Sequence, residues 1–82
     1  MNYFYVLLSH QDNDHDYGST TDLQKRVHEH VSGRVNSTRN RLPVRLVYYE
    51  AYETIDAARA RERQVKASGS VRSSLLKRIT RP

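Results

Sequence analysis

The fold of this chain is decided by Tyr17-Gly18-Ser19-Thr20-Thr21-Asp22-Leu23-Gln24-Lys25-Arg26-Val27-His28-Glu29-His30, where an extended segment turns through a glycine into a helix. Thr21 is predicted to cap this helix, and Gln24 three positions later completes a capping box. Asp22 in the first turn complements the positive end of the helix dipole. The stretch therefore predicts a strand, a turn and a helix in direct succession.

The predicted helix has a buried stripe and, beside it, a pair of polar side chains. The stripe consists of apolar residues at four-residue spacing, Leu23, Val27 and Val31. The helix is expected to close at Ser32-Gly33. Arg26 and His30 are also four positions apart, so both side chains emerge on one side of the helix, next to the stripe. An active-site helix would carry its functional groups in this position.

The length and composition of the chain favour one small domain over residues 1–82. A domain of 82 residues has one modest core and one surface site, because it buries only about 60% of the surface of its unfolded chain. The sequence has no cysteine, which excludes disulfides and thiolate metal sites. The apolar run over residues 4–8 is too short for a signal peptide and far shorter than the roughly 20 residues of a membrane span. We therefore expect a soluble, cytoplasmic protein without a membrane partner.

Positive charge is concentrated in the middle and at the end of the chain. The formal net charge is +5, although residues 1–22 carry four aspartates and no lysine or arginine. A basic, arginine-rich surface suits a polyanion, because the planar guanidinium binds phosphate through two hydrogen bonds; a solvated basic surface is the alternative. Residues 32–41 form a basic stretch without periodicity, which is typical of a mobile loop that can fold over a phosphate backbone. The candidate nucleic-acid-binding residues are Lys25, Arg34, Arg39 and Arg41.

The rest of the chain supplies two more strands and two more helices. Aromatic and β-branched residues predict strands at residues 3–8, 16–18 and 44–52. The first two are joined by a polar hairpin loop at residues 9–16. A second helix is expected from the cap Thr54 to about Lys66, and a last short helix has the stripe Val71, Leu75 and Ile79. The expected order is β-β-α-β-α-α, an α/β (α+β) fold with a three-stranded, mostly antiparallel sheet flanked by helices.

Glu62 is the least expected residue in the chain. The apolar arc of its helix contains Ile55, Ala58 and Val65, and Glu62 occupies the missing position of that series. Burying an unpaired carboxylate costs several kcal/mol. Glu62 should therefore have a cation, a proton or a hydrogen-bond partner.

Six motifs in sequence order resemble the GIY-YIG nuclease domain, specifically its small stand-alone members, which are described as predicted endonucleases. The first motif stands at residues 3–9, with Tyr5 as the motif tyrosine, and the second at Asp16-Tyr17-Gly18. The later motifs resemble the active-site helix, the segment after it, the third strand and the glutamate helix of that family, at residues 20–30, 32–41, 46–50 and 58–66. Each motif alone is weak, and the resemblance rests on their common order and spacing.

The resemblance implies a metal-dependent endonuclease that hydrolyses phosphodiester bonds of a nucleic acid, with DNA expected, in repair or recombination. Glu62 would hold one divalent cation, Mg²⁺ or Mn²⁺, together with waters and a substrate phosphate. Tyr5 would accept a proton from the attacking water, which requires nearby cations to lower its pKa. Arg26 would bind the scissile phosphate, and His30 would orient Tyr5 or shuttle a proton. Tyr17 is the remaining candidate catalytic residue.

The second motif departs from the family pattern. It normally begins with a tyrosine, whereas this chain has Asp16 there and Tyr17 at the next position. Neighbouring strand residues point to opposite faces, so Tyr17 replaces that tyrosine only if a bulge shifts the register by one residue. Without a bulge, Asp16 acts as a second metal ligand or base, or it repels phosphate and weakens activity.

Two other functions remain compatible with the sequence. One is a nucleic-acid-binding domain of the same fold in which Asp16 has weakened cleavage. The other is a basic module that contacts an acidic protein. The sequence contains no separate DNA-reading module, so selectivity for branched or nicked substrates, or targeting by a protein partner, is expected over sequence-specific cutting.

Overall fold

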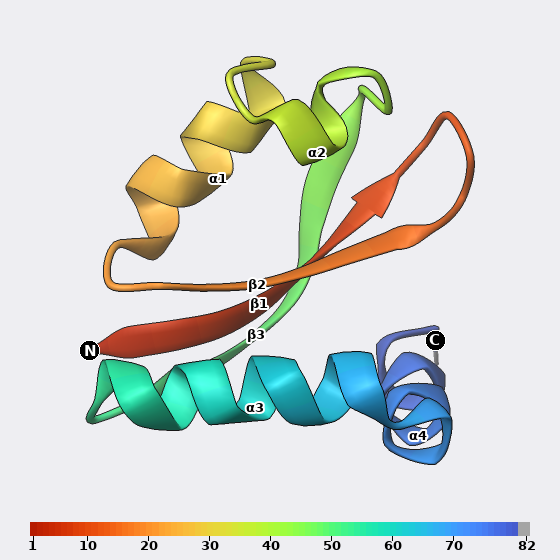
Figure 1. The fold of residues 1–82 in the computed structure, drawn as a ribbon. Coiled ribbons are helices and arrows are strands. Elements are labelled where there is room, and N and C mark those ends of the chain that lie inside the picture. Colours follow the sequence, from red (N-terminus) through yellow and green to blue (C-terminus); the bar gives the residue numbers. More distant parts are fainter. Residues whose placement is uncertain (81–82) are drawn as a thin grey trace.

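The computed structural model describes residues 1–80, so the last two residues of the predicted domain lie outside the described range. Its elements follow the predicted order with one short helix added (Figure 1). In sequence they are β1 (Asn2–Ser9), β2 (His15–Thr20), α1 (Leu23–Val31), α2 (Asn36–Arg39), β3 (Val44–Tyr52), α3 (Ile55–Ala67) and α4 (Gly69–Thr80). The prediction of an α+β fold is confirmed.

The three strands form an antiparallel sheet in the order β2-β1-β3, so β1 is central and β2 and β3 are the edges. The β1–β2 register is unbroken and places Tyr5 opposite Gly18 and Val6 opposite Tyr17. A bulge interrupts the other pairing, between β1 and β3, next to Val6. Because strand side chains alternate, Tyr5 and Val6 point to opposite faces of the sheet.

Helices cover the two faces of the sheet unequally. Figure 1 shows α1 and α2 on one side of the sheet and α3 and α4 on the other. The second side holds the main core, in which Phe4, Val6, Val65 and Leu75 are buried. Partly buried residues extend this core, namely Tyr17, Val47, Tyr48, Tyr52, Val71 and Ile79. Burial of each large apolar side chain contributes about 1.5–3 kcal/mol. The presence of Val65 from α3 and of Val71, Leu75 and Ile79 from α4 in this core confirms the stripes predicted for the two helices.

The start and the buried face of α1 differ from the prediction. The N-cap is Asp22, whose carboxylate accepts a hydrogen bond from the Lys25 backbone N–H at 3.1 Å. This cap places Lys25, and not Gln24, at the third helical position, so the predicted capping box does not form.

The stripe prediction for α1 is right in its first turns and wrong in its last. Leu23 and Val27 are half-buried, but Val31 is 50% exposed and the fully buried residue is His30. The helix thus turns the side carrying His30 toward the sheet, because the hydroxyl of Tyr5 supplies a partner for the imidazole there. Gly33 closes the helix as predicted, with the positive φ of 81° that glycine tolerates.

The segment after α1 is more ordered than its composition suggests. Residues 32–41 were predicted to be an aperiodic loop, and they contain the single-turn helix α2. Thr38 on α2 is fully buried and its hydroxyl is hydrogen-bonded to His30. That contact ties the segment to α1, and it involves a residue that no periodic pattern marks.

The helices of the described residues are all too short or too polar to cross a membrane.

Candidate active site

All five predicted catalytic residues border one pocket of about 230 Å³ at the β2 edge of the sheet. α1 approaches this edge from one face of the sheet and α3 from the other. The lining residues come from β1, β2, α1, α2 and α3: Tyr5, Asp16, Tyr17, Gly18, Ser19, Arg26, His30, Ser37, Glu62 and Lys66. An edge strand lets residues from both faces meet, because no further strand separates them.

Tyr5 lies directly over the backbone of Gly18. A Cβ built on Gly18 would be 2.3 Å from both the hydroxyl oxygen and the Cζ atom of the Tyr5 ring. Any side chain at residue 18 would therefore displace the phenol, which explains the glycine in the second motif. Gly18 thus permits a close approach of the Tyr5 ring to the backbone of β2.

The Tyr5 hydroxyl belongs to a chain of hydrogen bonds. It lies 3.0 Å from Nε2 of His30, whose Nδ1 lies 2.8 Å from Oγ1 of Thr38. Arg26 Nε donates to the same phenol oxygen at 3.4 Å. Since both ring nitrogens of His30 have hydroxyl partners, the imidazole is fixed in orientation, and one proton can be shared between it and Tyr5.

Burial controls the protonation of this chain. It raises the pKa of Tyr5, and the hydrogen bond and charge of Arg26 lower it only partly. Burial also lowers the pKa of His30, assisted by the nearby Arg26 charge. Tyr5 is thus a neutral phenol and His30 a neutral imidazole at neutral pH. The expectation that cations bring the Tyr5 pKa below its usual value is wrong for the protein by itself, because desolvation outweighs the effect of Arg26.

Glu62 reaches the pocket from the other face of the sheet. Ser19 Oγ donates to its Oε1 at 2.5 Å, and Lys66 Nζ, one helical turn further along α3, donates to its Oε2 at 2.6 Å. The predicted requirement for partners at Glu62 is thereby confirmed, with a hydroxyl on one oxygen and a cation on the other.

Because the pairing of β1 with β2 contains no bulge, Tyr17 and Asp16 point to opposite faces of the sheet. Tyr17 lies opposite Val6, packs against the core and stacks on His15. The bulge that would bring it onto the face of Tyr5 does not occur in the β1–β2 pairing. Asp16 points to that face, where an Arg41 nitrogen lies 3.9 Å from its carboxylate. A direct role of the Tyr17 hydroxyl beside Tyr5 is therefore not favoured.

The four predicted nucleic-acid-binding residues lie outside the pocket lining. Lys25 on α1, Arg34 and Arg39 are exposed. Arg41 is half-buried, and its Nε donates to Asp12 at 2.9 Å. That hydrogen bond is the largest factor that lowers the pKa of Asp12, to about 2. Arg41 is therefore engaged with carboxylates, which argues against the prediction that it binds phosphate freely.

A single divalent cation fits the oxygen atoms of this pocket. The described residues contain no group of three or more histidines, aspartates or glutamates placed to hold a metal, so a cage made by the protein alone is absent from this part of the chain. Mg²⁺ does not require one, because it keeps several waters and accepts one or two carboxylates plus substrate phosphate. Glu62, with Asp16 elsewhere in the same lining, offers the hard oxygen ligands that such an ion prefers.

Three polar residues of the site were not identified from the sequence. Thr38 and Ser19 contact His30 and Glu62 from other elements, and nothing in the local pattern marks them. Lys66 had a usable signal, because a lysine four positions after a glutamate on a helix is placed to form an ion pair.

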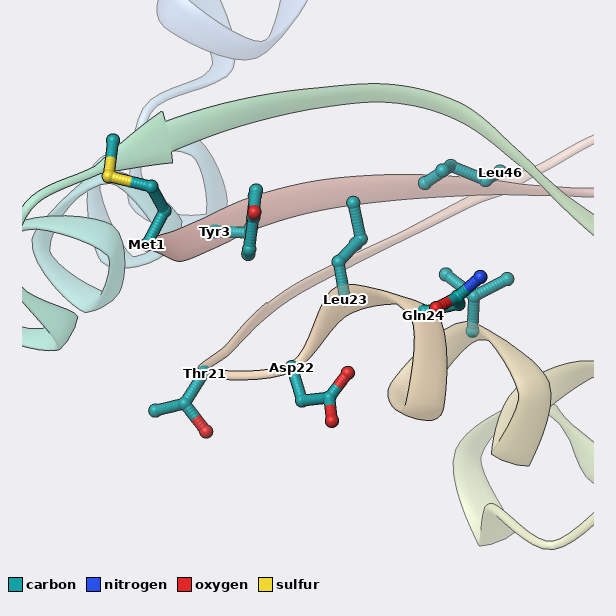
Figure 2. A pocket seen from close by; sticks show the side chains of 8 residues that line it. Met1, Tyr3, Thr21, Asp22, Leu23, Gln24 and Leu46 are labelled. Carbon is teal, nitrogen blue, oxygen red and sulfur yellow. The ribbon is translucent and has the colours of Figure 1, made fainter.

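A larger pocket of about 600 Å³ lies on the α1 side of the sheet (Figure 2). Met1, Tyr3, Leu23 and Leu46 give it an apolar wall. Figure 2 shows Leu23 pointing toward the sheet and Asp22 pointing away from it. Asp22 is the only acidic or basic side chain among its described lining residues, and it already caps α1. This pocket therefore lacks the groups that hydrolysis needs.

Comparisons with known proteins agree with this geometry. Residues 1–71 match the family model of the GIY-YIG catalytic domain. The chain is 40% identical over 67 residues to a UPF0213 protein of Haloquadratum walsbyi, covering 79% of this chain and 75% of that protein. It is 48% identical over 46 residues to UPF0213 proteins of Streptococcus pyogenes, covering 55% of this chain and half the length of those proteins.

A solved structure also resembles this fold. The solution NMR structure of a UPF0213 protein from Bacillus halodurans superposes with a TM-score of 0.56 at 31% identity, covering 98% of this chain and 86% of that one. The likeness therefore extends over nearly the whole chain, including the helices that border the pocket.

Proposed function

This chain belongs to the GIY-YIG family, and we propose that it is a single-domain, divalent-metal-dependent endonuclease that hydrolyses phosphodiester bonds of a nucleic acid, with DNA as the expected substrate. The observation that carries the proposal is the convergence of Tyr5, Arg26 and Glu62 on one pocket. These residues supply a proton acceptor, a phosphate-binding cation and a metal ligand, which are the groups that one-step hydrolysis requires.

The hydrogen bond between the Tyr5 hydroxyl and Nε2 of His30 provides a proton relay as an alternative to a free phenolate. As the attacking water adds to phosphorus, its proton passes to the oxygen of Tyr5 while the phenol proton passes to Nε2 of His30. Tyr5 then avoids a full negative charge, which its burial disfavours, while His30 takes a positive charge, which burial and the nearby Arg26 also disfavour. Thr38 keeps the imidazole in place during this transfer through its contact with Nδ1.

Arg26 and the cation would stabilise the charge that develops on the phosphate. The Arg26 side chain is 39% exposed, so it can bind a phosphate without leaving the pocket wall. Its interaction strengthens as negative charge accumulates on the phosphate oxygens in the transition state. A divalent ion held by Glu62 would neutralise the leaving oxygen when bound.

A nucleic-acid-binding domain with weak cleavage is the second candidate, and Asp16 is the observation that favours it. The carboxylate of Asp16 lies in the pocket wall, where it repels phosphate. The nearby Arg41 guanidinium offsets part of that charge. We therefore rank cleavage above binding alone.

Cleavage of a labelled substrate panel tests the proposal. The panel holds duplex, single-stranded, flapped and four-way-junction DNA together with an RNA duplex, each with Mg²⁺, with Mn²⁺ and with chelator. We expect metal-dependent cutting, best on branched substrates, since the described elements include no separate DNA-reading module. Glu62→Ala should reduce the rate at least about a hundredfold, the scale of a transition-state electrostatic contact.

The matched control is Glu53→Ala, which removes an exposed glutamate outside the pocket lining. Its cleavage rate should equal that of the wild type. Cutting that survives chelator or Glu62→Ala would refute the assignment of the metal ligand. Tight nucleic-acid binding without cutting would favour the second candidate.

A further inference from the structure

The two oxygens of the Glu62 carboxylate have partners of different kinds. Oε1 accepts a hydrogen bond from the Ser19 hydroxyl of strand β2, and Oε2 accepts one from the Lys66 ammonium of the same helix, α3. Both partners line the pocket with Glu62. A metal ion that binds this carboxylate must therefore replace one of them or fit beside it.

The two contacts differ in how easily they are broken. Ser19 sits on a paired strand, opposite Phe4, with a short side chain that has one rotatable bond. The Lys66 side chain is 53% exposed and flexible, and half-exposed ion pairs of this spacing contribute little to stability. Oε2 is thus the oxygen that a cation can reach at low cost.

Charge repulsion also prevents the Lys66 ammonium and a divalent cation from contacting Oε2 at the same time. An ammonium and a divalent cation repel each other at contact distance, so a cation that takes Oε2 displaces Lys66. The lining otherwise balances its charges, with Asp16 and Glu62 against Arg26 and Lys66 and with His30 neutral. A bound divalent cation gives this lining the net positive charge that a phosphate dianion-like transition state requires.

From these contacts we propose that Lys66 occupies the metal position at Oε2 of Glu62 until a divalent cation displaces it, while Ser19 holds Oε1 throughout. The displaced ammonium then binds the phosphate that enters the pocket beside Arg26. This inference rests on the proposed function and assigns two further residues to it, a positioning residue, Ser19, and a phosphate-binding residue, Lys66.

The proposal predicts opposite effects on metal affinity from two substitutions at the same carboxylate. Lys66→Met removes the competitor and should tighten Mn²⁺ binding about two- to fivefold, the range that corresponds to an exposed ion pair. Ser19→Ala frees the carboxylate to rotate and should weaken Mn²⁺ binding. A lysine whose ammonium does not contact the metal-binding oxygen would not produce the first effect.

Mn²⁺ binding by the whole protein, without nucleic acid, is measured by electron paramagnetic resonance of the free ion. Glu62→Ala should abolish binding at the pocket, and Lys77→Met, which removes an exposed lysine of α4 outside the lining, should leave the affinity unchanged. Unchanged or weaker Mn²⁺ binding by Lys66→Met would overturn the proposal, as would the absence of any binding that depends on Glu62. Circular dichroism confirms that each variant is folded.

Cleavage and nucleic-acid binding test the second role of Lys66. With saturating metal, Lys66→Met should cut more slowly than the wild type and should lower the dependence of log affinity on log salt by about one unit. A wild type that cuts while Lys66→Met gains no metal affinity would refute this inference and leave the nuclease proposal standing. If the wild type never cuts but Lys66→Met and Ser19→Ala still shift the Mn²⁺ affinity in opposite directions, the metal exchange at Glu62 is supported and the nuclease proposal is refuted.

Discussion

The carboxylates of Glu50 and Glu62 lie near opposite edges of the sheet and are held in different ways. Arg61 and Glu62 are neighbours on α3, yet Arg61 reaches Glu50 on the edge strand β3, and Glu62 reaches Ser19 on the other edge strand, β2. Glu50 accepts hydrogen bonds from Tyr48, Tyr52 and twice from Arg61, at 2.5–3.2 Å. Glu62 has one hydroxyl and one half-exposed lysine as partners.

The difference separates a structural carboxylate from one that is available for binding. The donors of Glu50 come from aromatic and guanidinium groups that are packed in place, and Arg61 also lies 5.7 Å above the ring centroid of Phe4. No cation can bind Glu50 without breaking that packing. Glu62 lines a pocket and its lysine partner is half-exposed, which is why we propose that the same chemical group acts there as a ligand.

Removing one tyrosine hydroxyl at each site should give the largest contrast. Tyr5→Phe eliminates the proposed proton acceptor and should lower the cleavage rate about 10²- to 10⁴-fold. Tyr52→Phe removes a hydroxyl from the Glu50 network and should leave the rate unchanged. Single-turnover kinetics on the best substrate of the panel checks both variants, and equal losses would contradict the division into structural and catalytic regions.

Replacing each glutamate by its neutral isostere, glutamine, should have the larger effect on stability at Glu50, the opposite of the contrast in cleavage rate. Glu50→Gln disrupts charge-assisted hydrogen bonds at partly buried donors and should cost about 2 kcal/mol, a decrease in melting temperature of roughly 8–16 °C for a domain of this size. Glu62→Gln should change stability by less than about 0.5 kcal/mol, because Lys66 is half exposed. Thermal and urea unfolding measure both values, and comparable losses would show that Glu62 is also structural.

Acid should weaken the Glu50 network. Burial by itself would raise the pKa of Glu50, but the hydrogen bonds from Tyr48, Tyr52 and Arg61 outweigh it and lower that pKa. A lowered folded-state pKa adds stability above the unfolded-state value, about 4.3, and the contribution is lost as the pH falls through the folded-state value.

Urea unfolding between pH 6 and pH 3 tests this dependence. The wild type should lose more stability over that interval than Glu50→Gln, whose network cannot titrate. Asp12→Asn, added to both proteins, removes a second carboxyl whose pKa is lowered, and the difference in acid sensitivity between the wild type and Glu50→Gln should persist. If the stabilities of the wild type and of Glu50→Gln fall in parallel with pH, groups other than Glu50 cause the acid sensitivity.

The smallest effect is expected at the pocket wall. Asp16→Asn removes a carboxylate that repels phosphate and should tighten nucleic-acid binding only about two- to threefold, because Arg41 already offsets the charge. In an Arg41→Gln background the same substitution should have a larger effect. A double-mutant cycle on DNA affinity measures this coupling, and strictly additive changes would show that Arg41 does not screen Asp16.

Local pattern was sufficient for every element of the described fold except the single-turn helix α2. Aromatic and β-branched residues placed the strands, and the apolar spacing of α3 and α4 identified Val65 and Leu75 as core residues. The same spacing marked Glu62 as a carboxylate on the wrong face, and the structure gives it the partners that burial demands. These features follow from the sequence because side chains three or four positions apart on a helix share a face whatever surrounds them.

Tertiary structure decided what each of those faces meets. Local spacing could not show that α1 turns His30 and not Val31 inward, since that depends on the phenol of Tyr5, which lies 25 positions away in the chain. Ser19 and Glu62 are 43 positions apart, and they meet because β2 is an edge strand that α3 crosses. The sequence by itself thus determined the strands, the helices other than α2, and the unexpected position of Glu62 on the apolar face of its helix. The partners of each polar group were set by the packing of distant elements, because a buried polar group pairs with whichever group the fold brings within hydrogen-bonding distance.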